Sequence, residues 1–136
     1  MEKVLPGGIY KDLFLTGNAS GDLFTVPAGR IVELLYGNFS IATDATVGNR
    51  VVTIACTLAA MLPTVLPLFY FTLAASLTRK LAFGTSKPAT DTDIDDTIQL
   101  PSRLLMNAGM EFEVAITAGE AGDYWYLHGK YIEWID

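Results

Sequence analysis

The chain has 136 residues, of which 51% are hydrophobic and 18% are charged, so it fits one folded domain and is not a disordered segment. Fifteen Asp and Glu against nine Lys and Arg give a net charge of −6, which argues against a protein that binds nucleic acid. The single Cys excludes an intrachain disulfide framework and a Cys-rich zinc site, and the single His makes His-based metal chemistry poor. We therefore expect one apolar-rich domain over residues 1–136, with no cofactor.

The N-terminal segment, residues 1–8, is expected to form an extended arm before the first strand. It lacks the basic start and the apolar run of about 7–15 residues that a secretory signal needs. Export by that route is therefore not expected.

Turn residues interrupt the apolar stretches of the chain at intervals that suit short strands better than helices. The interruptions lie at Gly17-Asn18, Pro27-Ala28-Gly29, Gly48-Asn49, Gly84 to Pro88, Asn107-Ala108-Gly109 and Gly119 to Asp123. Between them, hydrophobic residues alternate most clearly over residues 110–117, which is the period of a strand with one buried face. We predict strands over residues 9–16, 22–26, 30–42, 50–61, 68–77, 79–84, 96–105, 110–117 and 124–135.

The longest uncharged stretch, Val51 to Thr78, is long enough to span a membrane as a helix. Pro63 and Pro67 at its centre, together with the β-branched residues of its first half, argue against that helix. We interpret the stretch as two buried strands joined by a turn over residues 63–67, and we expect no membrane contact. One alternative stays open, in which residues 57–62 form a short helix that ends at Pro63.

The predicted strands indicate an all-β fold, namely an antiparallel β-sandwich of the jelly-roll kind with about eight strands in two sheets. One face of strand 50–61 would carry Val51, Thr53 and Thr57, which are small and uncharged. A face turned to solvent normally carries charge, so we interpret this one as a candidate interface of a homo-oligomer, with a trimer as the expected assembly. The alternative is a central strand that loops of the same chain cover.

The last predicted strand carries aromatic residues on both of its faces. The candidate interface residues in it are Tyr124, Tyr126, Tyr131 and Trp134. Three interpretations of these rings stay open: packing in the core, contact with another protein, and a platform on which sugar rings stack.

Two groups of residues have the types that chemistry needs. Residues 91–96 carry carboxylates at the first, third and fifth positions of a calcium loop, but Asp96 stands where that loop requires Gly and Ser102 where it requires Glu. A solvated loop without a metal is therefore expected. Cys56 and His128 are a conceivable nucleophile and base, but Cys56 lies in an apolar strand, which favours an inert thiol. We predict no catalytic residue and no enzymatic activity.

Several segments resemble a recurring pattern in small virion structural proteins of tailed bacteriophages. They are Thr25 to Arg30, Ala45 to Arg50, Leu100-Pro101 leading to Leu104-Leu105, Asn107 to Met110, Thr117 to Asp123, and the closing strand with its Trp residues. The resemblance implies a β-sandwich subunit of a phage particle, such as a capsid decoration (cement) protein, a head fibre or a tail accessory protein. It supplies no catalytic residues, and the long uncharged stretch departs from its pattern.

From the resemblance we expect a virion protein, assembled in the host cytoplasm, that binds the major capsid protein or another virion protein. A capsid decoration protein that stabilises the shell as a homotrimer suits an acidic, apolar-rich chain. The alternative is a carbohydrate- or receptor-binding β-sandwich module of a tail or head fibre.

Overall fold

The computed structural model describes residues 7–58, 64–85, 94–100 and 104–135. In these ranges every regular element is a strand, which confirms the predicted all-β class. The strands are β1 (Ile9–Gly17), β2 (Asp22–Thr25), β3 (Arg30–Ala42), β4 (Arg50–Leu58), β5 (Thr64–Leu73), β6 (Thr78–Gly84), β7 (Asp96–Gln99), β8 (Leu105–Asn107), β9 (Glu111–Thr117) and β10 (Tyr124–Ile135). No helix in the described ranges is long and apolar enough to cross a membrane.

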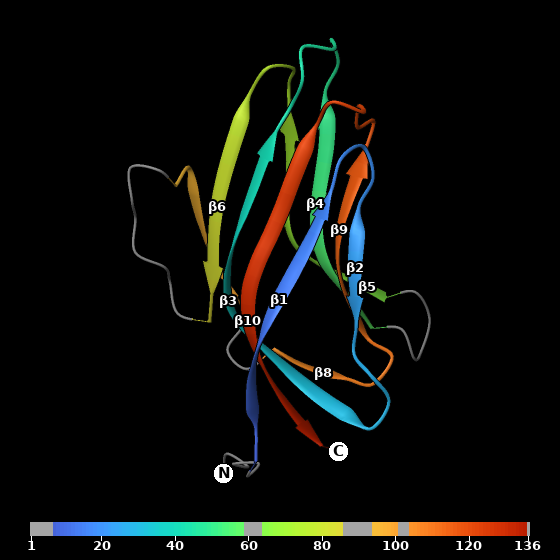
Figure 1. Ribbon diagram of the computed structural model, residues 1–136, viewed down its shortest axis with the longest axis vertical. Helices are drawn as coiled ribbons and strands as arrows, with labels where there is room; N and C mark the ends of the chain where they lie inside the picture. The colour runs from blue at the N-terminus through green and yellow to red at the C-terminus, as the bar shows by residue number, and fades with distance from the viewer. Residues whose placement is uncertain (1–6, 59–63, 86–93, 101–103, 136) are drawn as a thin grey trace.

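Two sheets pack face to face in a sandwich (Figure 1). Sheet A has the order β1-β10-β3-β6-β7, with β8 also paired to β3, and sheet B has the order β2-β9-β4-β5. Early strands pair with late ones: β1 with β10, β2 with β9, β3 with β6 and β4 with β5, all antiparallel. This nested pairing of eight strands is the jelly-roll arrangement, so the predicted sandwich is confirmed.

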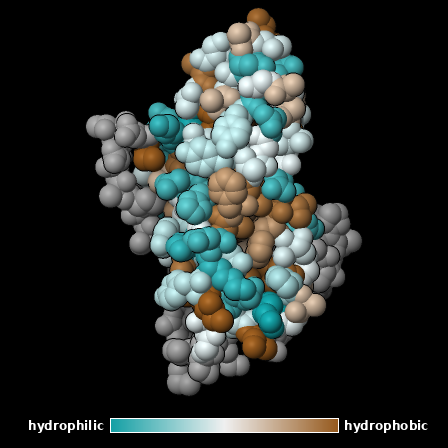
Figure 2. Space-filling model, in the orientation of Figure 1, coloured by the Kyte–Doolittle hydropathy of each residue, from teal (hydrophilic) through white to brown (hydrophobic). Residues whose placement is uncertain are grey.

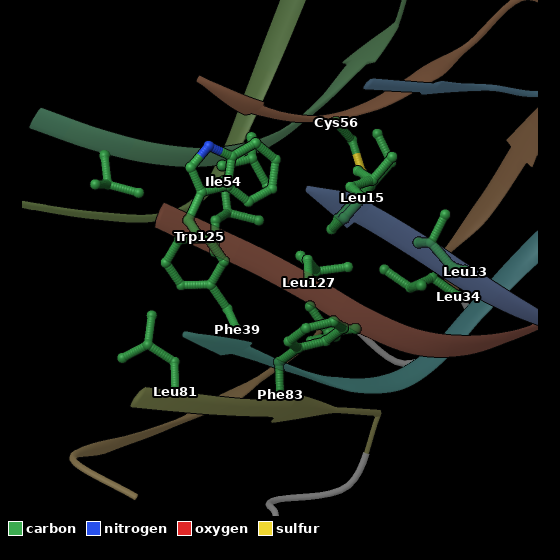
Figure 3. Packing of buried hydrophobic residues seen from close by; sticks show 14 of the residues in the cluster. Leu13, Leu15, Leu34, Phe39, Ile54, Cys56, Leu81, Phe83, Trp125 and Leu127 are labelled. Carbon is green, nitrogen blue, oxygen red and sulfur yellow. The ribbon is translucent and has the colours of Figure 1, made fainter. Parts of the chain in front are cut away.

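The core lies between the sheets because alternate side chains of each strand point inward. In β9, Phe112 and Val114 are fully buried, while Glu111 and Glu113 on the other face are only partly buried. Figure 3 shows Trp125 of β10 in the core beside Phe39 and Ile54. The ring centroids of Trp125 and Phe39 are 5.9 Å apart, and the indole N–H donates to the carbonyl of Ser20 at 2.9 Å. The polar edge of the largest buried side chain is therefore satisfied.

The turn predicted at Pro27-Ala28-Gly29 is present and joins β2 to β3. The N–H of Arg30 donates to the carbonyl of Pro27 at 3.2 Å, and Gly29 has a φ of +71°, which favours glycine. Proline fixes the entry of the turn and glycine permits its exit, so these residue types predict the turn from the sequence alone.

The turn predicted over residues 63–67 is wrong for residues 64–67. Strand β5 begins at Thr64 and continues through Pro67 to Leu73, so the strand predicted over 68–77 both begins and ends earlier. Pro67 is tolerated because β5 is an edge strand of sheet B, and the register with β4 shifts beside it, between Ile54 and Ala55. Of the alternative helix, residues 57 and 58 lie in β4, and residues 59–62 lie outside the described ranges.

The single strand predicted over residues 96–105 is also wrong, because the chain forms two short strands there. Strand β7 runs parallel to β6, and β8 runs antiparallel to β3, so the sandwich is not wholly antiparallel. The cause is the unequal length of the partners. β6 pairs only with Tyr36–Ala42 of β3, which leaves Ile31–Glu33 free to pair with β8. The predicted N-terminal arm lies outside the described residues except for Gly7 and Gly8.

Candidate interaction surfaces

The outward side of sheet A carries a group of exposed rings, which we call the aromatic face. It consists of Phe14 of β1, Tyr36 of β3, and Tyr124, Tyr126 and His128 of β10. Phe14, Tyr36 and Tyr124 are each at least half exposed. Figure 2 looks onto this side and shows rings interspersed with hydrophilic side chains. Exposed rings in such number are a mark of binding surfaces.

The four candidate residues of the last strand divide between this face and the protein interior. Tyr124 and Tyr126 lie on the aromatic face with their ring centroids 6.2 Å apart. Tyr131 points inward, is 7% exposed and packs its ring 5.1 Å from that of Phe24. Burial raises the pKa of the Tyr131 hydroxyl. Trp134 is also buried, and its indole lies over Gly8. Tyr131 therefore belongs to the hydrophobic core, and both rings are buried within the subunit.

The candidate residues of β4 lie together on the opposite side of the sandwich, on the outward side of sheet B. Val51, Thr53 and Thr57 are all partly exposed there, with Ala115 and Tyr70 paired across from Thr53. We call these five residues the β4 face. Glu111 and Glu113 of β9 lie beside Thr57 and Ala55 of β4, so charge borders this half of the face along its β9 side. The structure thus brings the candidate residues of β4 together on one surface, while those of β10 divide between the opposite surface and the interior.

A third surface lies at the end of the sandwich where β1 begins and β10 ends (Figure 1). Four large side chains are exposed there, and we call them the terminal patch: Ile9 (60%) and Ile135 (78%) on one side of sheet A, and Tyr10 (69%) and Leu105 (42%) on the other. Strand pairing holds Ile9 opposite Glu133 and Tyr10 opposite Ile132. Glu133 is itself buried and accepts a hydrogen bond from Lys11 at 2.7 Å.

The other end of the sandwich is held by a buried arginine, Arg50, at the start of β4. Its guanidinium is fully buried and donates to both carboxylate oxygens of Asp123, at 2.9 and 3.0 Å, and to Asp44 at 2.7 Å. Its remaining donors reach the carbonyls of Thr46 and Gly48. All its N–H groups are therefore used, which is what a buried guanidinium requires.

The carboxylate of Asp123 is fully buried and held in its charged form. Burial alone would raise the pKa of Asp123, but hydrogen bonds from Arg50 and from the backbone N–H groups of Glu120 and Asp44 lower that pKa below its usual value. One side chain thus ties together the loops that follow β3 and β9. This cluster is structural, because its polar atoms are hydrogen-bonded to other groups of the protein.

Cys56 and His128, the conceivable nucleophile and base in the sequence, lie in different places in the fold. Cys56 is buried between the sheets, where burial raises the pKa of its thiol to about 12, while His128 is exposed on the aromatic face. The expectation of a buried thiol is confirmed. Of the acidic run, Asp95 and Asp96 are described: Asp95 accepts from the backbone of Lys80, and Asp96 pairs with Arg79. Among the described residues, no group of three His, Cys, Asp or Glu could hold a metal ion.

Sequence reasoning missed the Arg50 cluster and the terminal patch. A lone arginine at the head of an uncharged strand was the available signal for the first, since a charge there needs a partner. The partner, Asp123, was seen only as part of a turn. The terminal patch has no local signal, because its residues come from three strands that are distant in sequence.

Comparisons with known proteins give distant similarities only. No family model and no curated protein matches the chain. A chain of desmodium yellow mottle tymovirus aligns with all of this chain and 91% of its own length, at 10% identity and a TM-score of 0.41. A chain of an infectious bursal disease virus particle aligns with 91% of this chain and 30% of its own length, at 12% identity and a TM-score of 0.35. Similarities this distant assign neither a family nor a role.

Proposed function

We propose that this protein is a structural subunit of a virus particle, of the capsid decoration kind, that binds a shell as a homo-oligomer and catalyses no reaction. The β4 face carries the proposal: an uncharged surface on a central strand that is only partly covered. The jelly-roll topology, which viral capsid and lectin domains share, and the phage-like turn segments support it. A fold alone does not fix a function, so each surface has to be tested.

The β4 face is suited to self-association. Strand β4 is flanked by β9 and β5, so it cannot extend the sheet, and contact has to be made through its side chains. Val51, Thr53 and Thr57 are small and uncharged, which allows close approach of a second flat surface. Rotational symmetry buries such a patch once per subunit and leaves no free copy of it, and we propose a trimer.

The terminal patch is suited to the shell. It exposes aliphatic and aromatic side chains at one end of the sandwich, away from the centre of the β4 face. Several weak contacts of this kind, one per subunit, combine in an oligomer to give firm attachment. The net charge of −6 favours a basic partner surface and disfavours packaged nucleic acid.

Light scattering coupled to gel filtration tests self-association. The wild-type protein should have three times the subunit mass of 14.7 kDa. Thr53→Glu puts a charge at the centre of the β4 face and should give the subunit mass with an unchanged circular dichroism spectrum. The matched control is Thr78→Glu, at an exposed position of sheet A, which should remain trimeric. A monodisperse wild-type monomer at micromolar concentration would overturn this part of the proposal.

Co-sedimentation with shells tests attachment. Replacing Ile9 or Ile135 with Ser should weaken binding by more than about 1 kcal/mol, roughly fivefold, as expected for an interface anchor. Val47→Ser is the control, because Val47 is 92% exposed in the loop between β3 and β4. Equal binding by all three variants and the wild type would show that the terminal patch does not hold the shell.

A further inference from the structure

A trough runs along the outward side of sheet A, over β3 and β6. The trough arises from the register of the strands, because paired residues of β10, β3 and β6 form rows of side chains across the sheet. One row is Tyr126, Ser40 and Lys80, and the next is His128, Asn38 and Ala82. In each row the large ring stands on β10 and the β3 residue is small, so the floor is low and the wall beside it is aromatic.

The trough has two successive hollows that share Asn38. The first, about 330 Å³, is lined by Asn38, Ser40, Lys80, Ile94, Tyr126 and His128. The second, about 300 Å³, continues toward Tyr36, Ala82, Gly84 and Thr85. Each lies at the lower end of the size range of ligand pockets, roughly 300–1,000 Å³. A ligand that fills both has to be elongated along the strands, with two units in line.

The described part of the chain leaves several polar side chains of the trough without a protein partner. Among the described residues, the side chains of Asn38, Ser40, Lys80 and Tyr126 make no hydrogen bond or ion pair with another protein group. Phe14 packs edge-on against His128 at 6.1 Å, which supports that wall of the trough from behind. The adjoining charges of Lys130 and Asp12 neutralise each other in a salt bridge.

These features select the chemistry of the occupant. The floor carries an amide, a hydroxyl and small side chains, so it lacks the large apolar anchors at the centre of a protein interface. A strongly anionic polymer is disfavoured by a chain of net charge −6. Sugars offer hydroxyl groups to Asn38 and Ser40, and the C–H face of a sugar ring can lie on the electron-rich face of Tyr126.

We propose that this trough binds an oligosaccharide of at least two sugar rings, with Tyr126 as the stacking residue and with Asn38 and Ser40 as hydrogen-bonding residues. The trough lies on the sheet opposite the β4 face, and the terminal patch lies at the end of the sandwich, so one subunit can self-associate, hold a shell and bind a glycan at once. The inference stands apart from the virion role, since it rests on neither of those two surfaces.

A glycan array that spans neutral oligosaccharides and bacterial surface polysaccharide fragments tests the proposal, followed by calorimetric titration of the best binder. The wild-type protein should bind at least one oligosaccharide, and a disaccharide unit should bind more tightly than its monosaccharide. Tyr126→Ala should weaken binding about tenfold, which corresponds to the loss of one stacked ring. Asn38→Ala should weaken it several-fold. Val47→Ala is the control, because Val47 is 92% exposed in the loop between β3 and β4 and belongs to none of the proposed surfaces.

Circular dichroism and the melting temperature show that each variant is folded before its affinity is compared. The proposal is overturned if the wild-type protein binds no glycan at millimolar concentration, or if Val47→Ala weakens binding as much as Tyr126→Ala. The light-scattering result is unaffected by either outcome, so failure of the glycan site and failure of the virion role are distinguishable.

Discussion

At the scale of single residues, Arg50 shows how one charge organises a loop-rich end of the sandwich. A guanidinium has five N–H donors in a fixed planar arrangement, and here carboxylates and carbonyls meet all of them. A lysine at position 50 would carry the same charge but would leave several of these acceptors unpaired. The residue type is therefore set by geometry as much as by charge.

Asp123→Asn should destabilise the protein by about 3 kcal/mol at pH 7, because it leaves the buried charge of Arg50 without its main partner. Since the folded-state pKa of Asp123 lies below its usual value of 3.8, the wild type keeps this stability above pH 3.8 and loses it as the pH falls through the lowered pKa. Urea unfolding from pH 7 down to pH 2.5 measures both effects, and the variant should lack the acid-dependent part.

The control for this change is Asp12→Asn. Asp12 pairs with Lys130 on the surface, with 63% of its side chain exposed, so its loss should change the free energy of unfolding little. If the two variants had equal stability, the buried cluster would not hold the loops as described.

At the scale of the elements, the pairing of β3 with β10 depends on a pair of glycines. Gly37 faces Gly129 across the two strands, and the ring of Phe83 covers them from the core side. A Cβ added to Gly37 would lie 2.7 Å from the carbonyl oxygen of His128 and would also meet the Phe83 ring. The backbone oxygen cannot rotate away, so the space is closed to any side chain.

Gly37→Ala should therefore cost about 3 kcal/mol of stability, at the upper end for an overpacked core position. Gly29→Ala is the comparison: a Cβ there has open space, and only the positive φ costs energy, about 1 kcal/mol. Chemical denaturation of both variants gives the two values. A loss for Gly37→Ala no larger than that for Gly29→Ala would contradict the close approach.

Strand β10 carries both buried and exposed rings, and only the buried ones should contribute much to stability. Tyr131→Ala should lower stability by about 3 kcal/mol, because it empties a buried site against Phe24. Tyr124→Ala, at a half-exposed ring of the same strand, should leave the melting temperature nearly unchanged. Calorimetry measures the melting temperature of both variants. An unchanged melting temperature for Tyr131→Ala would contradict core packing and favour an interface role for that ring.

The elements themselves were largely predictable from local patterns. β3 and β10 were predicted with their observed bounds because each long run begins directly after strong turn residues, Pro27-Ala28-Gly29 and Gly119 to Asp123. β5 was misplaced because a proline usually breaks a strand, and only its position at the sheet edge makes Pro67 acceptable. The division of residues 96–107 into two strands follows from the lengths of β3 and β6, which is a property of the assembled sheet and not of the segment.

At the scale of the whole molecule, the sequence predicts several residues of the exposed surfaces but not where those surfaces lie on the sandwich. The uncharged residues of β4 and the rings of β10 were both identified, yet nothing local shows that they lie on opposite sides of the sandwich. Placement depends on which sheet each strand joins, and that is fixed by pairings between strands from opposite ends of the sequence, such as Ile9 of β1 with Glu133 of β10. The trough over β3 and β6 arises in the same way.

The proposed function gives the three surfaces compatible roles: self-association through the β4 face, shell attachment through the terminal patch, and an aromatic side of sheet A that is turned outward. This arrangement requires that the subunit sit on its particle by one end. It also requires that the Arg50 end point away from the shell, since the two ends of the sandwich are opposite (Figure 1).

Electron cryo-microscopy of virus particles from cells that produce this protein tests the virion role most directly. We expect β-sandwiches bound in trimers at symmetry-related positions of the shell, each with Ile9 and Ile135 at the contact and sheet A exposed. Particles whose maps contain no such density, with the protein recovered only in the fraction free of particles, would contradict a structural role in the virion.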